Sequence, residues 1–237
     1  MRELLEKAAE RSIRYLEGLD KRKVAPGNDE IARLAAFNIP FPDKPVNPET
    51  VLQQMDDFGS PATTAMAGRR YFGFVIGGSL PAALAANWLA AAWDQNSGLY
   101  NISPAACAIE QVALNWLLDV LVLPQECAGA FVTGTTVANF TALAAARHSV
   151  LAKAGWNVEA DGLFGAPPVN VILGAEAHPT VFKSLGMLGL GRSRVVKVPV
   201  DRQGRIRPDS IPEIKGPTIV CLQAGNVNTG AIDPIRQ

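Results

Sequence analysis

The segment from residue 131 to residue 147, FVTGTTVANFTALAAAR, constrains the fold more than any other stretch of the chain. A short apolar run that ends at Val132 is typical of a strand, and an Ala- and Leu-rich helix is expected from Val137 onward. The turn between them, residues 133–136, carries three threonines around Gly134. Because a helix start has unpaired N–H groups and a positive dipole end, and glycine lets the backbone approach closely, this turn suits a phosphate. The alternative is an ordinary threonine-capped helix, which the segment taken alone favours.

The composition is that of a globular protein and excludes several classes of function. Of the 237 residues, 48% are hydrophobic and 19% charged, which is enough apolar material for a core. The 22 basic and 22 acidic residues balance, so we expect neither nucleic acid nor a membrane as a partner. The three scattered cysteines and two histidines lack metal-ligand spacing, which predicts no metal site. We expect the thiols to be reduced and buried in a cytoplasmic protein.

The first quarter of the chain is predicted to be helical and to have little core of its own. Helices are expected at residues 2–19, 29–37 and 49–58, and the prolines from Pro26 to Pro48 interrupt them. We therefore expect residues 1–68 to form a helical arm that packs on another body, such as a second subunit.

Residues 70–80, RYFGFVIGGSL, are expected to be an extended segment that runs into a glycine-rich loop. Such a loop either lines a pocket or is a plain connector, and the residues alone leave both interpretations open. Helices are then expected at residues 81–93 and 104–121, each with a proline in its first turn.

The second half of the chain alternates strands and helices. Strands are expected at residues 169–173, 194–200 and 218–223, and helices at residues 137–153, 181–190 and 209–214. This order predicts a mainly parallel sheet with right-handed crossovers, whose ligands bind beyond the carboxyl ends of the strands. Three polar segments follow strands: residues 133–136, 176–178 and 225–229. Three such segments at one sheet edge favour a ligand site over three unrelated caps.

Several longer segments together resemble one known family. They are YLEGLDKRKVAP, the loop before PAALAANWLAAAWDQN, SPAACAIEQVALNWL, TGTTVANFTALAAAR, GAEAHPTVFKSLGMLGLG, VPVDRQGRI and AGNVNTGAIDP. In order and spacing they resemble the group II amino-acid decarboxylases, which depend on pyridoxal phosphate and include the glutamate and aromatic amino-acid decarboxylases. The resemblance implies an α/β large domain of pyridoxal-phosphate fold type I, like that of aspartate aminotransferase, in residues 69–237, preceded by the helical arm. It also implies a homodimer and the decarboxylation of a small-molecule L-amino acid.

The resemblance assigns roles to particular residues. The family's phosphate-binding turn falls on Gly134, Thr135 and Thr136, and the histidine that covers the cofactor ring falls on His178. A cofactor-binding turn after a strand falls on Asn226, where the family commonly has threonine. The substrate-pocket loop falls on Phe74, Val75, Ile76 and Gly77. These residue types do not identify the amino acid, because the family varies them with the substrate.

One departure from the family concerns the lysine that tethers the cofactor as a Schiff base. In the family this lysine follows a histidine well beyond the AIDP motif, whereas His148 precedes Ser149 and His178 precedes Pro179. We therefore expect the large domain to be incomplete, with its remaining strands and the C-terminal domain absent from these 237 residues. The alternatives to a fragment of a decarboxylase are another fold type I enzyme, such as an aminotransferase or a lyase, and a truncated remnant without activity.

Overall fold

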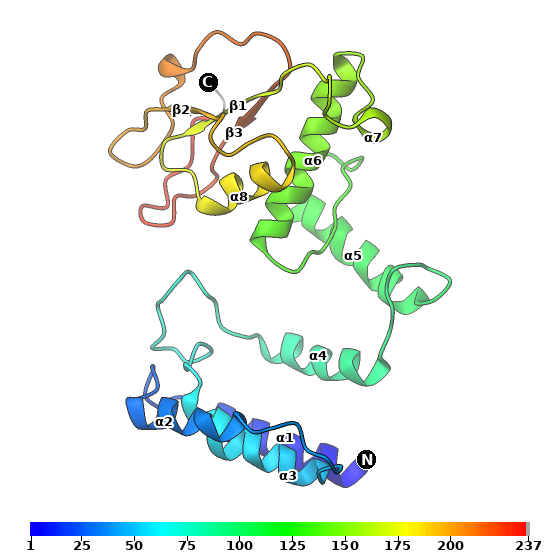
Figure 1. Ribbon diagram of the computed structural model, residues 1–237, viewed down its shortest axis with the longest axis vertical. Helices are drawn as coiled ribbons and strands as arrows, with labels where there is room; N and C mark the ends of the chain where they lie inside the picture. Colours follow the sequence, from blue (N-terminus) through cyan, green and yellow to red (C-terminus); the bar gives the residue numbers. More distant parts are fainter. Residues whose placement is uncertain (236–237) are drawn as a thin grey trace. The chain divides into compact units, whose positions relative to one another are not determined.

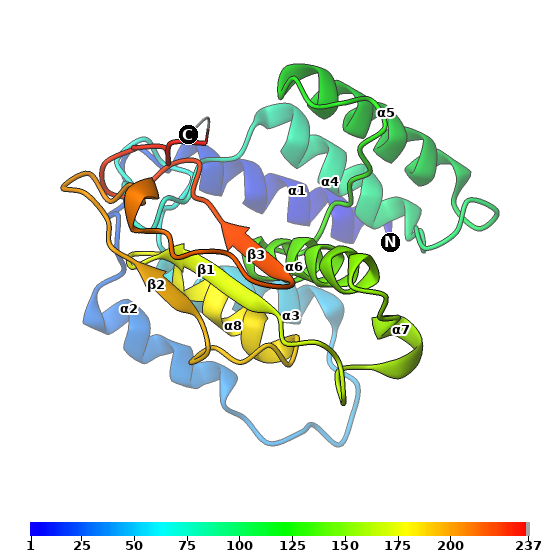
Figure 2. The same cartoon turned by 90° about the horizontal axis from the view of Figure 1, so that it is seen from above.

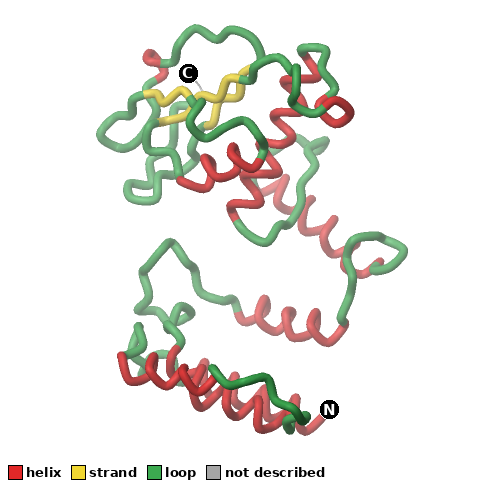
Figure 3. The backbone as a smooth tube through the Cα atoms, viewed as in Figure 1, coloured by secondary structure: helices red, strands yellow, loops and turns green. Residues whose placement is uncertain are grey.

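The structure, a computed structural model that describes residues 1–235, contains helices throughout and a small parallel sheet near its end (Figures 1 and 3). It divides into two compact units, the first spanning Met1–Asn96 and the second beginning at Ser97. This division leaves the boundary between residues 68 and 69 as a prediction. Gln237, where truncation is expected, lies outside the described residues.

The first unit is helical. Its elements are α1 (Arg2–Glu17), α2 (Asn28–Ala32), the 3₁₀ helix η1 (Arg33–Phe37), α3 (Pro48–Gln54), the π-helical turn η2 (Met55–Gly59), the 3₁₀ helix η3 (Ser60–Ala62) and α4 (Pro81–Trp93). Charged pairs join α1 to η2 and α3: Arg11 lies 2.7 Å from Asp56 of η2, and Lys7 lies 2.5 Å from Glu49 of α3. The predicted helices of this region form, although two of the three end in 3₁₀ or π turns.

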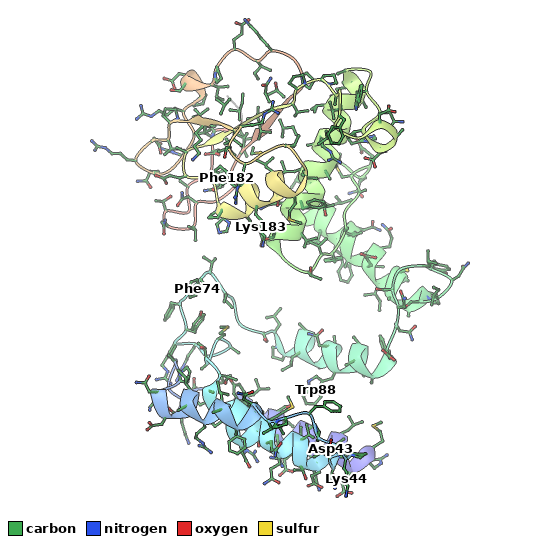
Figure 4. All side chains as sticks on the ribbon, in the orientation of Figure 1. Asp43, Lys44, Phe74, Trp88, Phe182 and Lys183 are labelled. Atoms are coloured by element: carbon green, nitrogen blue, oxygen red, sulfur yellow. The ribbon has the colours of Figure 1, made fainter. Side chains whose placement is uncertain are left out.

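The loop before α4 is not the extended segment that the sequence predicts. Phe74 and Val75 have φ angles of 55° and 57°, in the left-handed region that side chains with a Cβ rarely adopt. Both side chains are exposed, and Figure 4 shows Phe74 projecting from the tip of the loop. The prediction is wrong here because the backbone reverses direction at two consecutive residues, which β-propensity does not register.

The second unit holds the sheet. Its elements are α5 (Pro104–Val120), α6 (Thr135–Lys153), α7 (Val158–Asp161), β1 (Asn170–Gly174), α8 (Pro179–Met187), β2 (Val196–Val198), the 3₁₀ helix η4 (Pro208–Ser210) and β3 (Thr218–Cys221). The strand expected to end at Val132 is wrong: no strand of the described chain pairs with residues 128–132. An apolar run forms a strand only beside a partner, and none lies beside this one.

The parallel sheet is confirmed. Its strand order is β2-β1-β3, and Leu173 of β1 lies opposite Lys197 on one side and Cys221 on the other. The central strand is buried on both faces. Leu173 packs in a cluster with Leu143 of α6 and Leu185 of α8, the two helices that lie on one face of the sheet (Figure 2). Ile172 packs in a second cluster with Val198 of β2 and Ile206 of the loop that follows β2. Each fully buried leucine contributes about 1.5–3 kcal/mol, so this layer holds the edge at which a ligand would bind.

Candidate functional site

A cleft of about 410 Å³ opens beyond the carboxyl ends of β1 and β3. Its walls come from five parts of the second unit: the start of α6, the junction from β1 to α8, the end of β3, and the two loops that follow β2 and β3. The lining residues are Thr135, Asn139, Gly174, Glu176, Ala177, His178, Val181, Gly204, Cys221, Leu222, Gln223, Ala224 and Asp233. The structure therefore brings two of the predicted site residues, Thr135 and His178, to one cavity.

The helix α6 begins at this cleft without a capping side chain. Gly134 is its N-cap residue, and no side chain bonds to its first N–H groups. By contrast, Asn47 caps α3 and Asn157 caps α7 through their side chains. The threonine-capped alternative is therefore not what the structure contains. A Cβ built on Gly134 would meet no heavy atom within 4 Å, so there is open room beside the helix start.

This donor set fits a phosphate. The free N–H groups at the start of a 19-residue helix and the exposed hydroxyl of Thr135 are all donors, and the helix dipole adds positive potential. Thr136 lies one residue further on and is half-buried, and it does not line the cleft. Thr136 can therefore contribute its backbone N–H, in the first turn of α6, to a phosphate site, but not its hydroxyl.

His178 lines the same cleft as the N-cap residue of α8. Its Nδ1 atom is 3.3 Å from the backbone N of Thr180 and 2.9 Å from the Thr180 hydroxyl oxygen. The hydroxyl also accepts a hydrogen bond from Nδ2 of Asn139, at 2.9 Å. Sequence reasoning missed both Asn139 and Thr180, because a bond between residues 41 positions apart appears only when α6 and α8 pack together.

A second bond ties the two helices together closer to the core. The hydroxyl of Ser184 is fully buried and donates between the carbonyl oxygens of Thr136, at 3.1 Å, and Thr180, at 2.9 Å. It fixes the first turn of α6 against α8. The helix start and His178 are thereby held by the same pair of braced helices.

The loop walls of the cleft depend on Asp233, which lies in the AIDP segment. Its buried carboxylate accepts hydrogen bonds from the backbone N–H groups of Ile206, at 2.8 Å, and Gln223, at 2.7 Å. It thus joins the loop after β2 to the end of β3. The AIDP motif was the one sequence signal that could have identified this residue.

Asn226 lies near the cleft but does not line it. Its Oδ1 atom accepts hydrogen bonds from the N–H groups of Asn228, at 2.9 Å, and Thr229, at 3.3 Å. Gly204 packs against the side chain of Asn226. A Cβ at position 204 would lie 2.5 Å from Nδ2 of Asn226 and 2.9 Å from Oε2 of Glu176, and the φ angle of Gly204 is 78°. The side chain of Asn226 therefore holds its own turn, and its contact with a cofactor stays a prediction.

Other predicted or notable residues lie outside the cleft. Phe74, Val75, Ile76 and Gly77 belong to the first unit, and their part in a substrate pocket stays a prediction. Lys183 is exposed on α8, beside Phe182 in the chain (Figure 4), and is not among the lining residues.

Across residues 1–235 no group of three His, Cys, Asp or Glu side chains could hold a metal ion. None of the helices described is long and apolar enough to cross a membrane. On the cleft itself, burial raises the pKa of the Cys221 thiol.

An uncapped helix start and an imidazole at the carboxyl edge of a parallel sheet define an α/β domain suited to a phosphorylated ring cofactor. A sequence profile of the family described as the pyridoxal-dependent decarboxylase conserved domain matches residues 32–237. The chain belongs to this family. The expected family, and pyridoxal phosphate as its cofactor, are confirmed.

Individual relatives agree with the family. The chain is 24% identical over 263 aligned residues to tryptophan decarboxylase 1 of Oryza sativa subsp. japonica, covering 99% of this chain and 49% of that protein. It is 30% identical over 164 residues to an L-2,4-diaminobutyrate decarboxylase of Rhizobium meliloti, covering 65% of this chain and 30% of that protein. The chain spans at most about half the length of these curated relatives.

Solved structures confirm the fold. The crystal structure of mouse CSAD matches with a TM-score of 0.87 at 22% identity, covering 98% of this chain and 50% of that one. That of Oryza sativa TDC with PLP and tryptamine matches with a TM-score of 0.83 at 22% identity, covering 99% of this chain and 50% of that one. The predicted α/β fold type I large domain, present in part after an N-terminal helical segment, is thus confirmed.

Proposed function

We propose that the whole protein decarboxylates an L-amino acid with pyridoxal phosphate held in the cleft of the second unit. The observation that carries this proposal is that one cavity has the uncapped start of α6 on one wall and His178 on another. Bound pyridoxal phosphate supplies an electron sink for the carbon that loses its carboxyl group. The chain's own residues bind and orient the reactants.

The start of α6 binds the phosphate in this proposal. Gly134 leaves room for it, the hydroxyl of Thr135 donates to it, and the N–H groups of the first turn, including that of Thr136, complete the cradle. A doubly charged group at this end of a long helix gains from the dipole as well as from the hydrogen bonds.

His178 covers the cofactor ring. An imidazole presents a flat, partly apolar face to an aromatic ring and keeps one nitrogen for a hydrogen bond. With Nδ1 turned to Thr180, that nitrogen is Nε2. Asn226 is proposed to act near the ring through the turn that it holds, and not through its Oδ1 atom, which is already bonded.

The substrate and the partner remain proposals of the same kind. Phe74, Val75, Ile76 and Gly77 line the substrate pocket in this proposal, which the exposure of Phe74 and Val75 supports, because apolar loop residues gain by being covered. Residues 1–68 act as the arm of a homodimer. The protein works in the cytoplasm, in line with its three free cysteines.

The test measures cofactor binding and turnover separately. Pyridoxal phosphate is titrated into the whole protein and followed by absorbance, and release of carbon dioxide is then measured with a panel of L-amino acids. Thr135→Val is expected to weaken cofactor binding, and His178→Phe to lower turnover more than binding. Thr141→Val is the control for Thr135→Val, since Thr141 lies on α6 and, among the described residues, its hydroxyl bonds only to the carbonyl of Val137, at 2.9 Å.

The outcomes separate the hypotheses. Binding without release of carbon dioxide, but with amino-group transfer or cleavage, would favour another enzyme of the same fold. No binding by the whole protein would refute the proposal and favour a remnant without activity. Sedimentation of the protein tests the homodimer, which a purely monomeric species at micromolar concentration would contradict.

A further inference from the structure

We propose that Thr180 and Asn139 are positioning residues that keep the proton of the neutral His178 ring on Nε2. They act through a chain of hydrogen bonds that runs from Asn139 to Thr180 and ends on Nδ1 of His178. The proposal rests on the proposed function only for its consequence in the reaction. The position of the proton is a property of this chain and can be measured without the cofactor.

The backbone N–H of Thr180 supplies the first step. It lies 3.3 Å from Nδ1 of His178, and a backbone N–H can only donate. Nδ1 must therefore offer its lone pair. Because a neutral imidazole carries one proton, that proton is on Nε2 whenever this bond is made.

The hydroxyl of Thr180 supplies the second step. Its oxygen lies 2.9 Å from Nδ1, and taken alone it could donate to that nitrogen or accept from it. Nδ2 of Asn139 lies 2.9 Å from the same oxygen and donates to it. With an accepted bond in place, the single hydroxyl proton is left for Nδ1. The chain then has one direction, from Asn139 through Thr180 to His178.

The packing of the two helices keeps this chain in place. Asn139 is half-buried on α6 and Thr180 is half-buried on α8. Ser184, one turn beyond Thr180, bonds to the carbonyl of Thr136 and so fixes the same pair of helices. Rotation of the ring by half a turn about its bond to Cβ would put the carbon Cδ2 in the place of Nδ1, and both bonds to Thr180 would be lost.

The consequence is chemical. No hydrogen bond among the described residues uses Nε2, so this nitrogen is left for a ligand in the cleft. With its proton held there, His178 presents a donor and not an acceptor. Such a ring hydrogen-bonds an anionic oxygen of a bound ligand without first having to change its tautomer.

The experiment reads the two ring nitrogens directly. The whole protein is labelled with ¹⁵N, and long-range proton–nitrogen correlations of its histidines are recorded at about pH 8, above the ordinary histidine pKa of about 6.5. The signals of His178 are those lost in His178→Gln. We expect a pyrrole-type Nε2 and a pyridine-type Nδ1.

Three variants test the chain of bonds. Thr180→Val keeps the backbone N–H and removes the hydroxyl, and we expect it to raise the population protonated on Nδ1 about threefold to tenfold, the change that one lost hydrogen bond produces. Asn139→Ala is expected to act in the same direction, and Thr180→Ser to restore the wild-type spectrum. Thr141→Val, whose hydroxyl bonds elsewhere on α6, is expected to change nothing.

Two results would overturn the proposal: a wild-type ring protonated mainly on Nδ1, or Thr180→Val and Asn139→Ala spectra equal to that of the wild type. If Thr180→Val fails to fold, Asn139→Ala with Thr180→Ser decides. Cofactor titration distinguishes this failure from failure of the proposed function. A protein that shows the expected tautomer but binds no pyridoxal phosphate refutes the function alone, and one that decarboxylates with the proton on Nδ1 refutes only this inference.

Discussion

Replacing Asp233 is expected to loosen the cleft wall and destabilise the fold. Its carboxylate is buried and accepts two backbone N–H groups, those of Ile206 and Gln223. A hydrogen bond to a charged group contributes about 1.5–3 kcal/mol, and a buried donor left unpaired adds its desolvation cost. Asp233→Ala removes both bonds. We expect it to lower the free energy of unfolding by about 3–5 kcal/mol, the lower end applying if water reaches the partly buried Gln223 N–H.

The isosteric variant sharpens this prediction. Asp233→Asn keeps one oxygen acceptor and turns a donor NH₂ group toward the other backbone N–H. One bond is lost and its partner is opposed, so we expect a loss of about 2–3 kcal/mol with almost no change in volume. Asp209→Asn is the matched control, because Asp209 is exposed on η4 and is expected to shift stability by less than about 0.5 kcal/mol.

Urea denaturation measures both variants, and hydrogen exchange locates the effect. The midpoint should fall for Asp233→Asn while the slope stays constant, which indicates a change in stability and not in the unfolded state. The amide protons of Ile206 and Gln223 should lose protection before those of β1. If Asp233→Asn behaves like Asp209→Asn, the carboxylate does not hold the wall and the reasoning fails.

Three further predictions concern Asp201, Cys221 and Gly134. The backbone N–H of Arg205, followed by its side chain, lowers the pKa of Asp201 below its ordinary 3.8, so its stabilising contribution is present above that pH and is lost as the pH falls through the lowered value. Asp201→Asn should accordingly lower the urea midpoint at pH 7 but not near pH 2, and equal differences at both would contradict this. Burial raises the pKa of the Cys221 thiol, so iodoacetamide should modify Cys221 more slowly than the exposed Cys127 at pH 7.5. Bound pyridoxal phosphate should slow the modification of Cys221 alone, because Cys221 lines the cleft. Equal modification of Cys221 with and without pyridoxal phosphate would contradict binding in this cleft. Gly134→Ala should change stability by at most about 1 kcal/mol, since the φ of Gly134 is extended at 161° and an added Cβ would meet no heavy atom within 4 Å. The same methyl group should weaken pyridoxal phosphate binding, because it fills the room beside the start of α6. Unchanged binding would show that Gly134 is not part of the phosphate site.

The elements that the sequence predicts well are those with local start signals. Pro81 and Pro104 stand at the first positions of α4 and α5, where proline fits a helix, and both helices begin at those residues. The parallel sheet follows from alternation alone. The misses have non-local causes: residues 131–132 lack a partner strand, and Phe74 adopts a left-handed conformation that no propensity predicts.

The site divides in the same way. His178 could be found because it follows β1, and the strands of a parallel sheet end at one edge. Thr135 could be found from the glycine and threonines at the start of α6, although no strand of the described chain precedes them. Asn139 and Thr180 could not be found, because their bond depends on how α6 crosses α8. Asp233 falls between these cases: its motif is visible, but its two backbone partners are distant in the sequence.

Hydrogen-bond use separates the polar residues of the sheet edge into two groups. The side-chain oxygens of Asn226 and Asp233 accept hydrogen bonds from backbone N–H groups of the loops, so they hold the walls of the cleft whether or not a ligand is bound. Within the described chain, the Thr135 hydroxyl, the N–H groups at the start of α6 and Nε2 of His178 have no protein partner. Unbonded donors at the edge of a sheet are costly to leave unused when a closed site excludes water. We therefore propose that a cofactor gains its hydrogen bonds from the second group. Substitutions there should change cofactor binding at little cost in stability, whereas substitutions in the first group should lower stability and change binding less.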